Sequence, residues 1–192
     1  TLRTTAPLAG NNLHLALDLR TQEIAEKAFG EHRGALVAIE PATGGVIALV
    51  SKPGFDPNLF VEGIDPQNWD ALNTSLDKPR NHRALQGGHP PGSTFRPFMA
   101  LAGLELGKRR PDYSISDPGY FTLPGVGRPW RDWKKGGHGT VDLKRSITIS
   151  CDTYYYGLAH QMGIERMAGF LSQFGFGRKS GVDLDGELAG LM

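Results

Sequence analysis

The sequence predicts an α/β (α+β) fold in which a β-hairpin and several helices alternate with long irregular loops. Residues 35–39 and 46–50 are short apolar runs joined by a Pro-Ala-Thr-Gly-Gly segment, which is typical of a hairpin. Apolar residues recur at helical spacing in residues 95–104 and 154–162. The 26 glycines and 13 prolines among 192 residues favour many turns over a helical bundle.

Bulk composition excludes several classes of protein. The net charge is +1, from 21 basic and 20 acidic residues, so no nucleic-acid partner is expected. No run of eighteen apolar residues predicts a transmembrane helix, and the polar residues 1–10 lack the apolar core of a signal peptide. Cys151 is the single cysteine, so the chain has no internal disulfide.

The N-terminal part is predicted to be a linker followed by a folded domain. Residues 1–12 are polar and end in Gly-Asn-Asn, as a linker entering the domain of residues 13–192 would. Residues 13–17 alternate in polarity and predict a half-buried strand. Residues 18–21 can cap a helix that ends at Gly30. Because both runs of the following hairpin are apolar throughout, we expect both of its faces to be covered.

Two long stretches lack periodicity. Residues 51–92 are interrupted by prolines, and so long a loop in a compact domain usually builds or lines a site. Residues 108–140 are also irregular, and Thr140 is predicted to cap the short helix that follows. The apolar segment 154–162 ends at Gly163, and another segment follows it.

Ser93 is the first candidate for chemistry. The Pro-Pro-Gly turn before it and the apolar run from Phe95 indicate a serine at the first turn of a buried helix, where the helix dipole favours developing negative charge. Arg96 lies three positions on, on the same helical face. This is the pattern of an S-x-x-K acyl-transfer site with arginine in place of lysine. A helix N-cap is the alternative role for Ser93.

A second candidate motif is Ser150-Cys151-Asp152, between two helical segments. A serine acyl-transfer site needs a proton shuttle near its nucleophile, and an S-x-N or S-x-D loop can place a hydroxyl there. The alternative is that Ser150 and Asp152 only cap and begin the next helix.

Together these motifs resemble the transpeptidase domain of a class B penicillin-binding protein. The resemblance covers essentially the whole chain. It is carried by residues 17–19, 41–45, 51–58, 90–94, 131–135 and 150–154. It implies a penicillin-binding protein/β-lactamase-like fold, with an antiparallel sheet flanked by helices and a helical subdomain. Residues 1–12 would be a linker from an absent pedestal domain. Because no K-T-G motif is found, residues 13–192 would be the N-terminal portion of the domain.

The resemblance implies a peptidoglycan D,D-transpeptidase that cross-links stem peptides during cell elongation. Ser93 would form the acyl-enzyme and would also be the target of β-lactam antibiotics. Ser150 and Asp152 would belong to the proton relay. The implied setting is the periplasmic face of the bacterial inner membrane, with a SEDS-family glycan polymerase as partner.

Arg96 departs from the family pattern. The family's lysine is thought to take the serine proton as a neutral amine, and a guanidinium cannot act as that base. We therefore predict that acylation is strongly impaired. The alternative function is a catalytically impaired domain of the same fold that binds β-lactams or peptides; a β-lactam sensor is a more remote one.

A candidate metal site involves Asp117, Asp132, His138 and Cys151, whose side chains are all acceptable Zn²⁺ ligands. Their irregular spacing alone is weak support. Some members of one branch of the family carry a structural zinc with these ligand types at matching positions, so the resemblance implies a structural Zn²⁺ here. A free, buried Cys151 is the alternative.

Overall fold

The computed structural model describes residues 6–191, and its contacts divide into two compact units, one ending at Gly87 and the other beginning at Gly88. Each unit is considered by itself. Of the predicted linker, residues 6–12 are exposed and have no regular structure, and residues 1–5 lie outside the described part. Within the described residues, no helix is long and apolar enough to span a bilayer.

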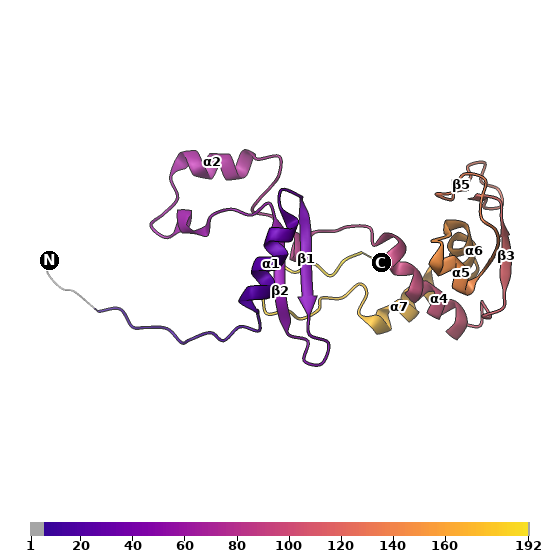
Figure 1. Cartoon of the computed structure of the whole chain (residues 1–192), viewed down its shortest axis with the longest axis horizontal. Coiled ribbons are helices and arrows are strands. Elements are labelled where there is room, and N and C mark those ends of the chain that lie inside the picture. The colour runs from indigo at the N-terminus through magenta and orange to yellow at the C-terminus, as the bar shows by residue number, and fades with distance from the viewer. Residues whose placement is uncertain (1–5, 192) are drawn as a thin grey trace. The chain divides into compact units, whose positions relative to one another are not determined.

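The first unit is built around a β-hairpin (Figure 1). Its helices and strands, in chain order, are α1 (Leu19–Phe29), β1 (Gly34–Ile39), β2 (Val46–Lys52), the 3₁₀ helix η1 (Pro57–Phe60), α2 (Pro66–Thr74) and α3 (Arg83–Gln86).

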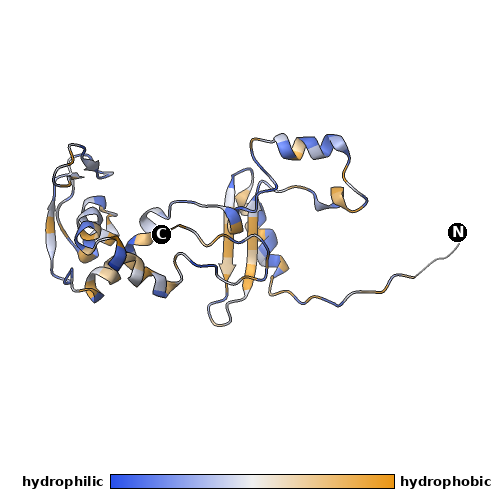
Figure 2. Ribbon diagram, turned by 180° about the vertical axis from the view of Figure 1, so that it is seen from behind, coloured by the Kyte–Doolittle hydropathy of each residue, from blue (hydrophilic) through white to orange (hydrophobic). Residues whose placement is uncertain are grey.

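The predicted hairpin is confirmed, but its two faces differ in burial. Strands β1 and β2 pair antiparallel, with Leu36 opposite Val50, and both strands are largely apolar (Figure 2). Ala48 and Val50 are buried against α1. On β1, however, Val37 and Ile39 are 45% and 55% exposed. The expectation that both faces are covered is therefore wrong for this chain.

Helix α1 begins and ends where local signals predict. Asp18 accepts a hydrogen bond from the Thr21 amide at 2.7 Å, and Gly30 forms the C-cap with φ of 50°. The strand predicted at residues 13–17 is wrong: the segment is exposed and pairs with no described strand. Alternating polarity identifies a strand only where a partner strand is available to satisfy its backbone.

Gln22 joins α1 to the hairpin. Its side-chain amide accepts from Leu49 N at 2.8 Å and donates to Leu49 O at 3.0 Å. We expect Gln22→Met to destabilise this unit by about 1–3 kcal/mol, because both backbone groups lose their partner in a partly buried place. Denaturant unfolding measures the loss. Glu23→Met, on the exposed side of α1, should stay within about 0.5 kcal/mol of the parent; an equal effect of the two would contradict this role for Gln22.

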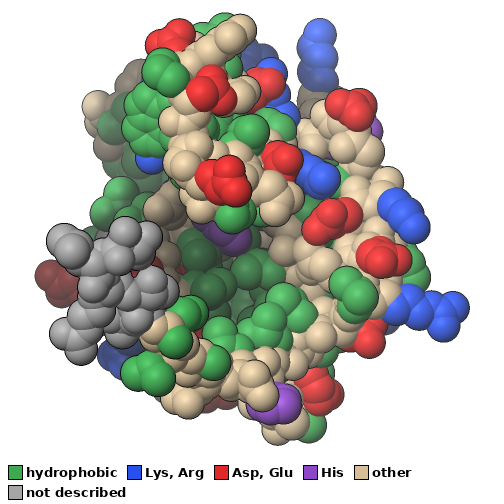
Figure 3. Space-filling model, turned by 90° about the vertical axis from the view of Figure 1, so that its left-hand side faces the viewer, with side chains coloured by type: hydrophobic (Ala, Val, Ile, Leu, Met, Phe, Trp, Pro, Cys, Tyr) green, Lys and Arg blue, Asp and Glu red, His purple; other side chains and the backbone are tan. Residues whose placement is uncertain are grey.

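The long segment after the hairpin, predicted as a loop over residues 51–92, contains more regular structure than predicted. Asp65 caps α2 by accepting from Asn68 N at 3.0 Å, with Pro66 in the first turn. Several large side chains of this excursion are exposed, among them Val61 and Leu76. Green apolar side chains accordingly reach the surface on the face shown in Figure 3.

The second unit combines helices with short paired strands. In chain order it contains the 3₁₀ helix η2 (Gly92–Phe95), α4 (Arg96–Glu105), β3 (Ser114–Asp117), β4 (Tyr120–Phe121), β5 (Trp130–Arg131), β6 (Gly139–Asp142), α5 (Leu143–Thr148), α6 (Asp152–Met162), α7 (Ile164–Leu171) and the 3₁₀ helix η3 (Ser172–Phe174). Strand β3 pairs antiparallel with β6, and β4 pairs antiparallel with β5.

The core of this unit lies between α4, α6 and α7, where Met99, Leu158 and Leu171 are buried. The helix after β6 is capped by Asp142, which accepts from Arg145 N at 2.7 Å. The prediction that Thr140 caps it is wrong, because Thr140 still belongs to β6 and pairs with β3. The carboxylate two residues later provides the cap.

Candidate active site and metal cluster

Ser93 lies inside the 3₁₀ turn η2, which leads directly into α4. Its side chain is exposed, and neither helix start has a side-chain cap among the described contacts. The alternative role of Ser93 as an N-cap therefore has no support in this geometry. A serine at an exposed turn, ahead of a buried helix, is instead held in place with its hydroxyl accessible.

Ser150 brings the second motif to Ser93. Its hydroxyl donates to Ser93 Oγ at 2.7 Å, although the two residues are 57 positions apart. Ser150 has a φ of 58°, a left-handed conformation that is uncommon outside glycine. The indole N–H of Trp133 donates to the Ser150 carbonyl at 3.0 Å and so supports this conformation. Cys151, and not Ser150, occupies the N-cap position of α6, without a side-chain cap bond.

Arg96 is bound to both polar members of the second motif. It donates from Nη1 to Ser150 Oγ at 2.5 Å and from Nη2 to Oδ1 of Asp152. The other oxygen of Asp152 accepts from the Trp133 amide at 3.1 Å. The guanidinium side chain is only 11% exposed and lies over the ring of Tyr155 at 5.5 Å. Arg96 is thus a fixed, mostly desolvated cation beside the two serines.

In these contacts Arg96 can only donate, whereas each serine hydroxyl can donate or accept. Arg96 donates to Ser150, and Ser150 donates to Ser93. A proton leaving Ser93 must travel toward an acceptor, and a guanidinium has none. The two serine hydroxyls are in contact, but the cation beside them cannot take a proton.

A cluster of four buried side chains lies beside the Ser150 loop. Asp117 ends β3, Asp132 follows β5, His138 precedes β6 and Cys151 precedes α6. One ligand atom from each lies within 4.8 Å of all the others, and all four residues are buried. Residues that show no common spacing in the sequence are therefore brought together by the pairing of β3 with β6 and of β4 with β5.

Two of three separations between ligand atoms in this cluster fit a tetrahedral metal ion. His138 Nδ1 lies 2.9 Å from Asp117 Oδ2 and 3.6 Å from Asp132 Oδ1, and Cys151 Sγ lies 3.5 Å from Asp117 Oδ2. Zinc bonds of about 2.0–2.3 Å at tetrahedral angles place ligand atoms roughly 3.3–3.8 Å apart. The 3.5 and 3.6 Å separations fall in this range, whereas the 2.9 Å separation is that of a hydrogen bond. Two carboxylates, an imidazole and a thiol are all acceptable Zn²⁺ ligands, so the cluster fits Zn²⁺ in its chemistry.

The protein environment raises the pKa of the thiol in this cluster and lowers the pKa of the two carboxylates. Burial, together with the carboxylates of Asp117 and Asp132, raises the pKa of the Cys151 thiol to about 12. For the two aspartates, burial opposes ionisation, but hydrogen bonds from backbone N–H groups and neighbouring side chains outweigh it and lower their pKa. The chain alone therefore holds two ionised carboxylates and a neutral thiol; a bound cation would favour the thiolate.

Comparison with known proteins agrees with this geometry. Residues 34–192 match the model of the penicillin binding protein transpeptidase domain. The chain belongs to the penicillin binding protein transpeptidase family.

Similar proteins include penicillin-binding protein 2, which agrees with the resemblance inferred from the motifs. The chain is 51% identical to the peptidoglycan D,D-transpeptidase MrdA of Acinetobacter baumannii over 185 residues, covering 96% of the chain but 28% of that protein. Pseudomonas aeruginosa PBP2 in complex with WCK 5153 superposes with a TM-score of 0.88 at 49% identity, over 93% of this chain and 40% of that one. Helicobacter pylori PBP2, in a complex with MreC, gives 0.86 at 33% identity, over 91% and 33%.

The structure brings together all the residues that the penicillin-binding protein motifs singled out. Ser93, Arg96, Ser150 and Asp152 form one hydrogen-bonded group. The four candidate metal ligands form another. Sequence reasoning missed Trp133, which hydrogen-bonds to Asp152 and to the Ser150 carbonyl. The Arg-Asp-Trp-Lys-Lys stretch that contains Trp133 contributed to the family resemblance, but it did not indicate these hydrogen bonds.

The two groups are joined through Asp132. Its Oδ2 accepts from the amides of Asp152 at 2.7 Å and Thr153 at 3.2 Å. A carboxylate at the first turn of α6 satisfies N–H groups that have no partner within the helix and interacts favourably with the helix dipole. In this penicillin-binding protein domain, one of the four candidate metal ligands therefore holds the start of the helix that presents the second motif.

Gly137 provides the close packing that the cluster needs. A methyl group on Gly137 would overlap the carbonyl oxygen of Asp117 and lie 2.6 Å from the carbonyl carbon of Pro118. We expect Gly137→Ala to destabilise the unit by more than about 4 kcal/mol, because rigid backbone must move. Gly136→Ala is the matched control: Gly136 also has positive φ, of 87°, but open space around it, so the loss should be about 1–2 kcal/mol. Thermal unfolding of both variants tests the difference; equal losses would contradict the packing role.

Proposed function

We propose that this chain is part of a peptidoglycan D,D-transpeptidase whose nucleophile is Ser93. The observation that carries the proposal is the 2.7 Å hydrogen bond between the hydroxyls of Ser93 and Ser150, which unites two motifs far apart in sequence. Because the chain spans 28% of the Acinetobacter relative's length, the activity belongs to the larger protein.

The proposed reaction proceeds in two acyl transfers. Ser93 Oγ attacks the carbonyl carbon of the penultimate D-Ala of a stem peptide, and the amine of the terminal D-Ala leaves with a proton. The amine of a second stem peptide then attacks the ester carbonyl, which forms the cross-link and returns the proton to Ser93. A β-lactam carbonyl would acylate the same oxygen. The Ser93 amide, at the first turn of η2, is available to stabilise the oxyanion.

Ser150 and Asp152 would form the relay and Arg96 would limit it. Ser150 lies within hydrogen-bond reach of the nucleophile, and Asp152 is paired with Arg96. Since Arg96 offers donors only, it can hold Ser150 and Asp152 in position but cannot accept the proton of Ser93. The chain with Arg96 would therefore bind substrates and β-lactams while acylating slowly.

The metal cluster would hold a structural Zn²⁺. Asp117, Asp132, His138 and Cys151 would be its four ligands, and a closed four-ligand set leaves no position for a substrate. The ion would supply positive charge to two adjacent buried carboxylates and fix the loop before β6 to the start of α6. Each of the four residues would then influence the second motif by helping to fix the backbone at the start of α6.

The larger protein would act at the periplasmic face of the bacterial inner membrane during cell elongation. Its partners would be peptidoglycan stem peptides, β-lactam antibiotics and a SEDS-family glycan polymerase in the membrane. Support for a multiprotein assembly comes from the Helicobacter pylori relative, whose structure is a complex with MreC. The nearly neutral charge of the chain supports the expectation of no nucleic-acid partner.

A chimaera tests the nucleophile. The 185 residues of this chain that align with the Acinetobacter relative, carrying Arg96→Lys, would replace the matching segment of that protein, and fluorescent penicillin would be added. We expect a covalent adduct that peptide mapping by mass spectrometry assigns to Ser93. Adding Ser93→Ala should abolish it, whereas Thr94→Val, one residue away, should retain it. An adduct that survives Ser93→Ala would overturn the assignment.

A further inference from the structure

The turn between α5 and α6, residues 149–151, carries Ser150 in a position that glycine usually occupies. The amide of Ser150 donates to the Ile147 carbonyl at 3.2 Å. The amide of Cys151 donates to the Ser146 carbonyl at 3.0 Å. These two bonds form a Schellman motif, in which the residue after the helix cap has a left-handed conformation. Ile149 is the cap of α5, so Ser150, with φ of 58°, is that left-handed residue.

The left-handed conformation of Ser150 has a cost and a benefit. It costs free energy, because the Cβ that glycine lacks is crowded by the backbone in this region. Glycine would end α5 with less strain, but it would bring no hydroxyl to the site. The serine hydroxyl lies 2.7 Å from that of Ser93. Contacts from outside the turn are therefore needed to hold a backbone conformation that serine by itself disfavours.

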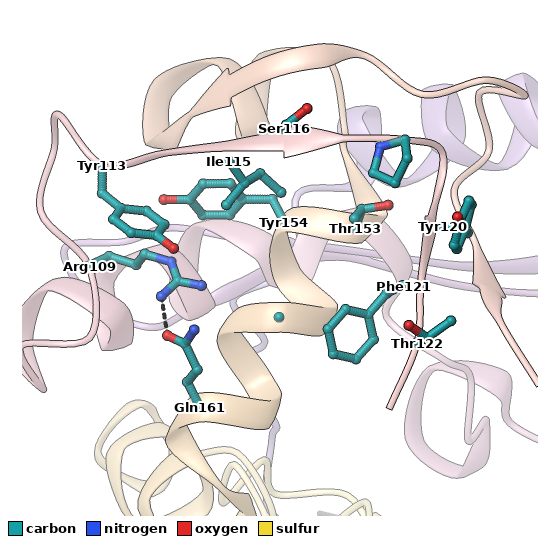
Figure 4. Close-up of a pocket in the computed structure, with 12 residues that line it drawn as sticks. Arg109, Tyr113, Ile115, Ser116, Tyr120, Phe121, Thr122, Thr153, Tyr154 and Gln161 are labelled. Atoms are coloured by element: carbon teal, nitrogen blue, oxygen red, sulfur yellow. Dashed lines mark hydrogen bonds between the residues drawn. The ribbon is translucent and has the colours of Figure 1, made fainter. Parts of the chain in front are cut away.

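The helices on both sides of this turn are held by packing, whereas the turn itself is less so. Helix α5 is buried at Leu143, and α6 is buried at Leu158. Farther along α6, the side chain of Gln161 accepts a hydrogen bond from Arg109 (Figure 4). Residues 149 and 150 are only half-buried, so packing leaves their backbone less constrained than that of the two helices.

Trp133 holds this part of the turn from a different loop. Its indole N–H is shared between the carbonyls of Ser150 at 3.0 Å and Ile149 at 3.2 Å, and such shared bonds are common at helix ends. The two carbonyls belong to the peptide groups immediately before and after the Ser150 Cα. Because each peptide group is planar, holding both of them restricts both φ and ψ of Ser150.

The ring of Trp133 contributes little to the core. The residue is 65% exposed, and its ring meets that of His138 edge-on, with 5.3 Å between the centroids. Its backbone amide donates to Asp152 Oδ2 at 3.1 Å, a bond that any side chain at this position would allow. A substitution can therefore remove the indole N–H without opening a cavity in the core.

We propose that Trp133 is a positioning residue for acyl transfer. Its indole N–H holds the peptide groups on both sides of Ser150 and so keeps the Ser150 hydroxyl on Ser93. This role rests on the proposed function, since the reaction needs Ser150 in this place only if Ser93 is the nucleophile. Trp133 acts through Ser150 and not on the reacting atoms.

Kinetics of penicillin acylation in the chimaera that carries Arg96→Lys test the proposal. Trp133 would be changed to Phe (Trp133→Phe) or replaced by 3-benzothienylalanine, which keeps the shape of the indole but has sulfur in place of N–H. Each change should lower the saturating acylation rate by about tenfold, because a displacement of about 1 Å can cost even more. The penicillin concentration that gives the half-maximal rate should change by less than about threefold, because the hydrogen bonds lost are within the protein.

Trp130→Phe is the matched control. Trp130 lies three residues earlier, on β5, where it pairs with Phe121, and its indole makes no hydrogen bond to the turn within the described part of the chain. The acylation rate of this variant should follow that of the parent chimaera. Equal losses of rate at the two tryptophans, or a change in the half-maximal concentration alone, would overturn the proposal.

NMR of the 192-residue chain measures the position of Ser150 without any reaction. A short distance between HN and Hα within Ser150 is the signature of its positive φ. The parent and Trp130→Phe should show this signature, and both changes at Trp133 should weaken or abolish it. An unchanged Ser150 in the Trp133 variants would overturn the proposal. A parent chimaera that is not labelled would contradict the proposed function instead, and the NMR comparison would then decide whether Trp133 holds the turn.

Discussion

Arg96→Lys is expected to raise the rate of penicillin acylation at Ser93 by about 10²–10⁴-fold, the usual contribution of a positioned general base. A neutral amine at this position could accept the proton that Ser150 receives from Ser93. The guanidinium instead donates to Ser150 and has no acceptor of its own, so it cannot take the proton of Ser93. The rate would be measured as the growth of covalent fluorescence with time in the chimaera described above.

Control substitutions separate the effect of a new proton acceptor from the effect of removing the positive charge. Arg96→Met removes the cation without adding a base, so its rate should stay near that of the parent. If relief of positive charge were the cause, Arg96→Met would accelerate acylation as much as Arg96→Lys does. Equal acylation rates for the parent and Arg96→Lys would show that the proton of Ser93 leaves by another route.

The second large effect is expected on metal removal. The protein purified without chelator should contain about one zinc per chain, and a strong chelator should lower the Tm of the second unit by more than about 8 °C. A loss of about 2 kcal/mol suffices for this, since a domain of this size shifts by about 4–8 °C per kcal/mol, and structural zinc sites contribute more than that. Metal analysis and thermal unfolding before and after chelation measure the two quantities.

Substitutions identify the ligands. Cys151→Ser should lose the bound zinc and become insensitive to chelator. Asp112→Asn is the matched control for a loop carboxylate, because Asp112 is exposed and contacts only Arg110 among the described side chains; its zinc content and Tm should follow the parent. Protein that contains no zinc before chelation, or a Cys151→Ser variant that keeps it, would contradict the proposed site.

Local signals in the sequence predict some elements well. The Gly-Gly turn of the hairpin, the Asp18 cap of α1 and the stop at Gly163 each act within a few residues, so they can be recognised without the rest of the fold. The strands of the second unit could not be predicted, because β4 and β5 are two residues long and show no periodicity. They exist because their backbones pair with partners distant in sequence.

The residues of the candidate site also differ in how far the sequence could predict their association. Ser93 and Arg96 are neighbours on one short segment, so spacing alone places them together. The four candidate metal ligands extend over residues 117–151, and only the resemblance to a family predicted their association.

Three consecutive residues have three different roles. Ser150 contacts Ser93, the proposed nucleophile, Cys151 belongs to the buried cluster, and Asp152 begins α6 and pairs with Arg96. Inserting or deleting a single residue here would move at least one of them by more than about 3 Å. Evolution can therefore change side chains in this segment but not its length. Residues 124–129, which are exposed, have no such constraint, and natural variants are expected to differ in length there.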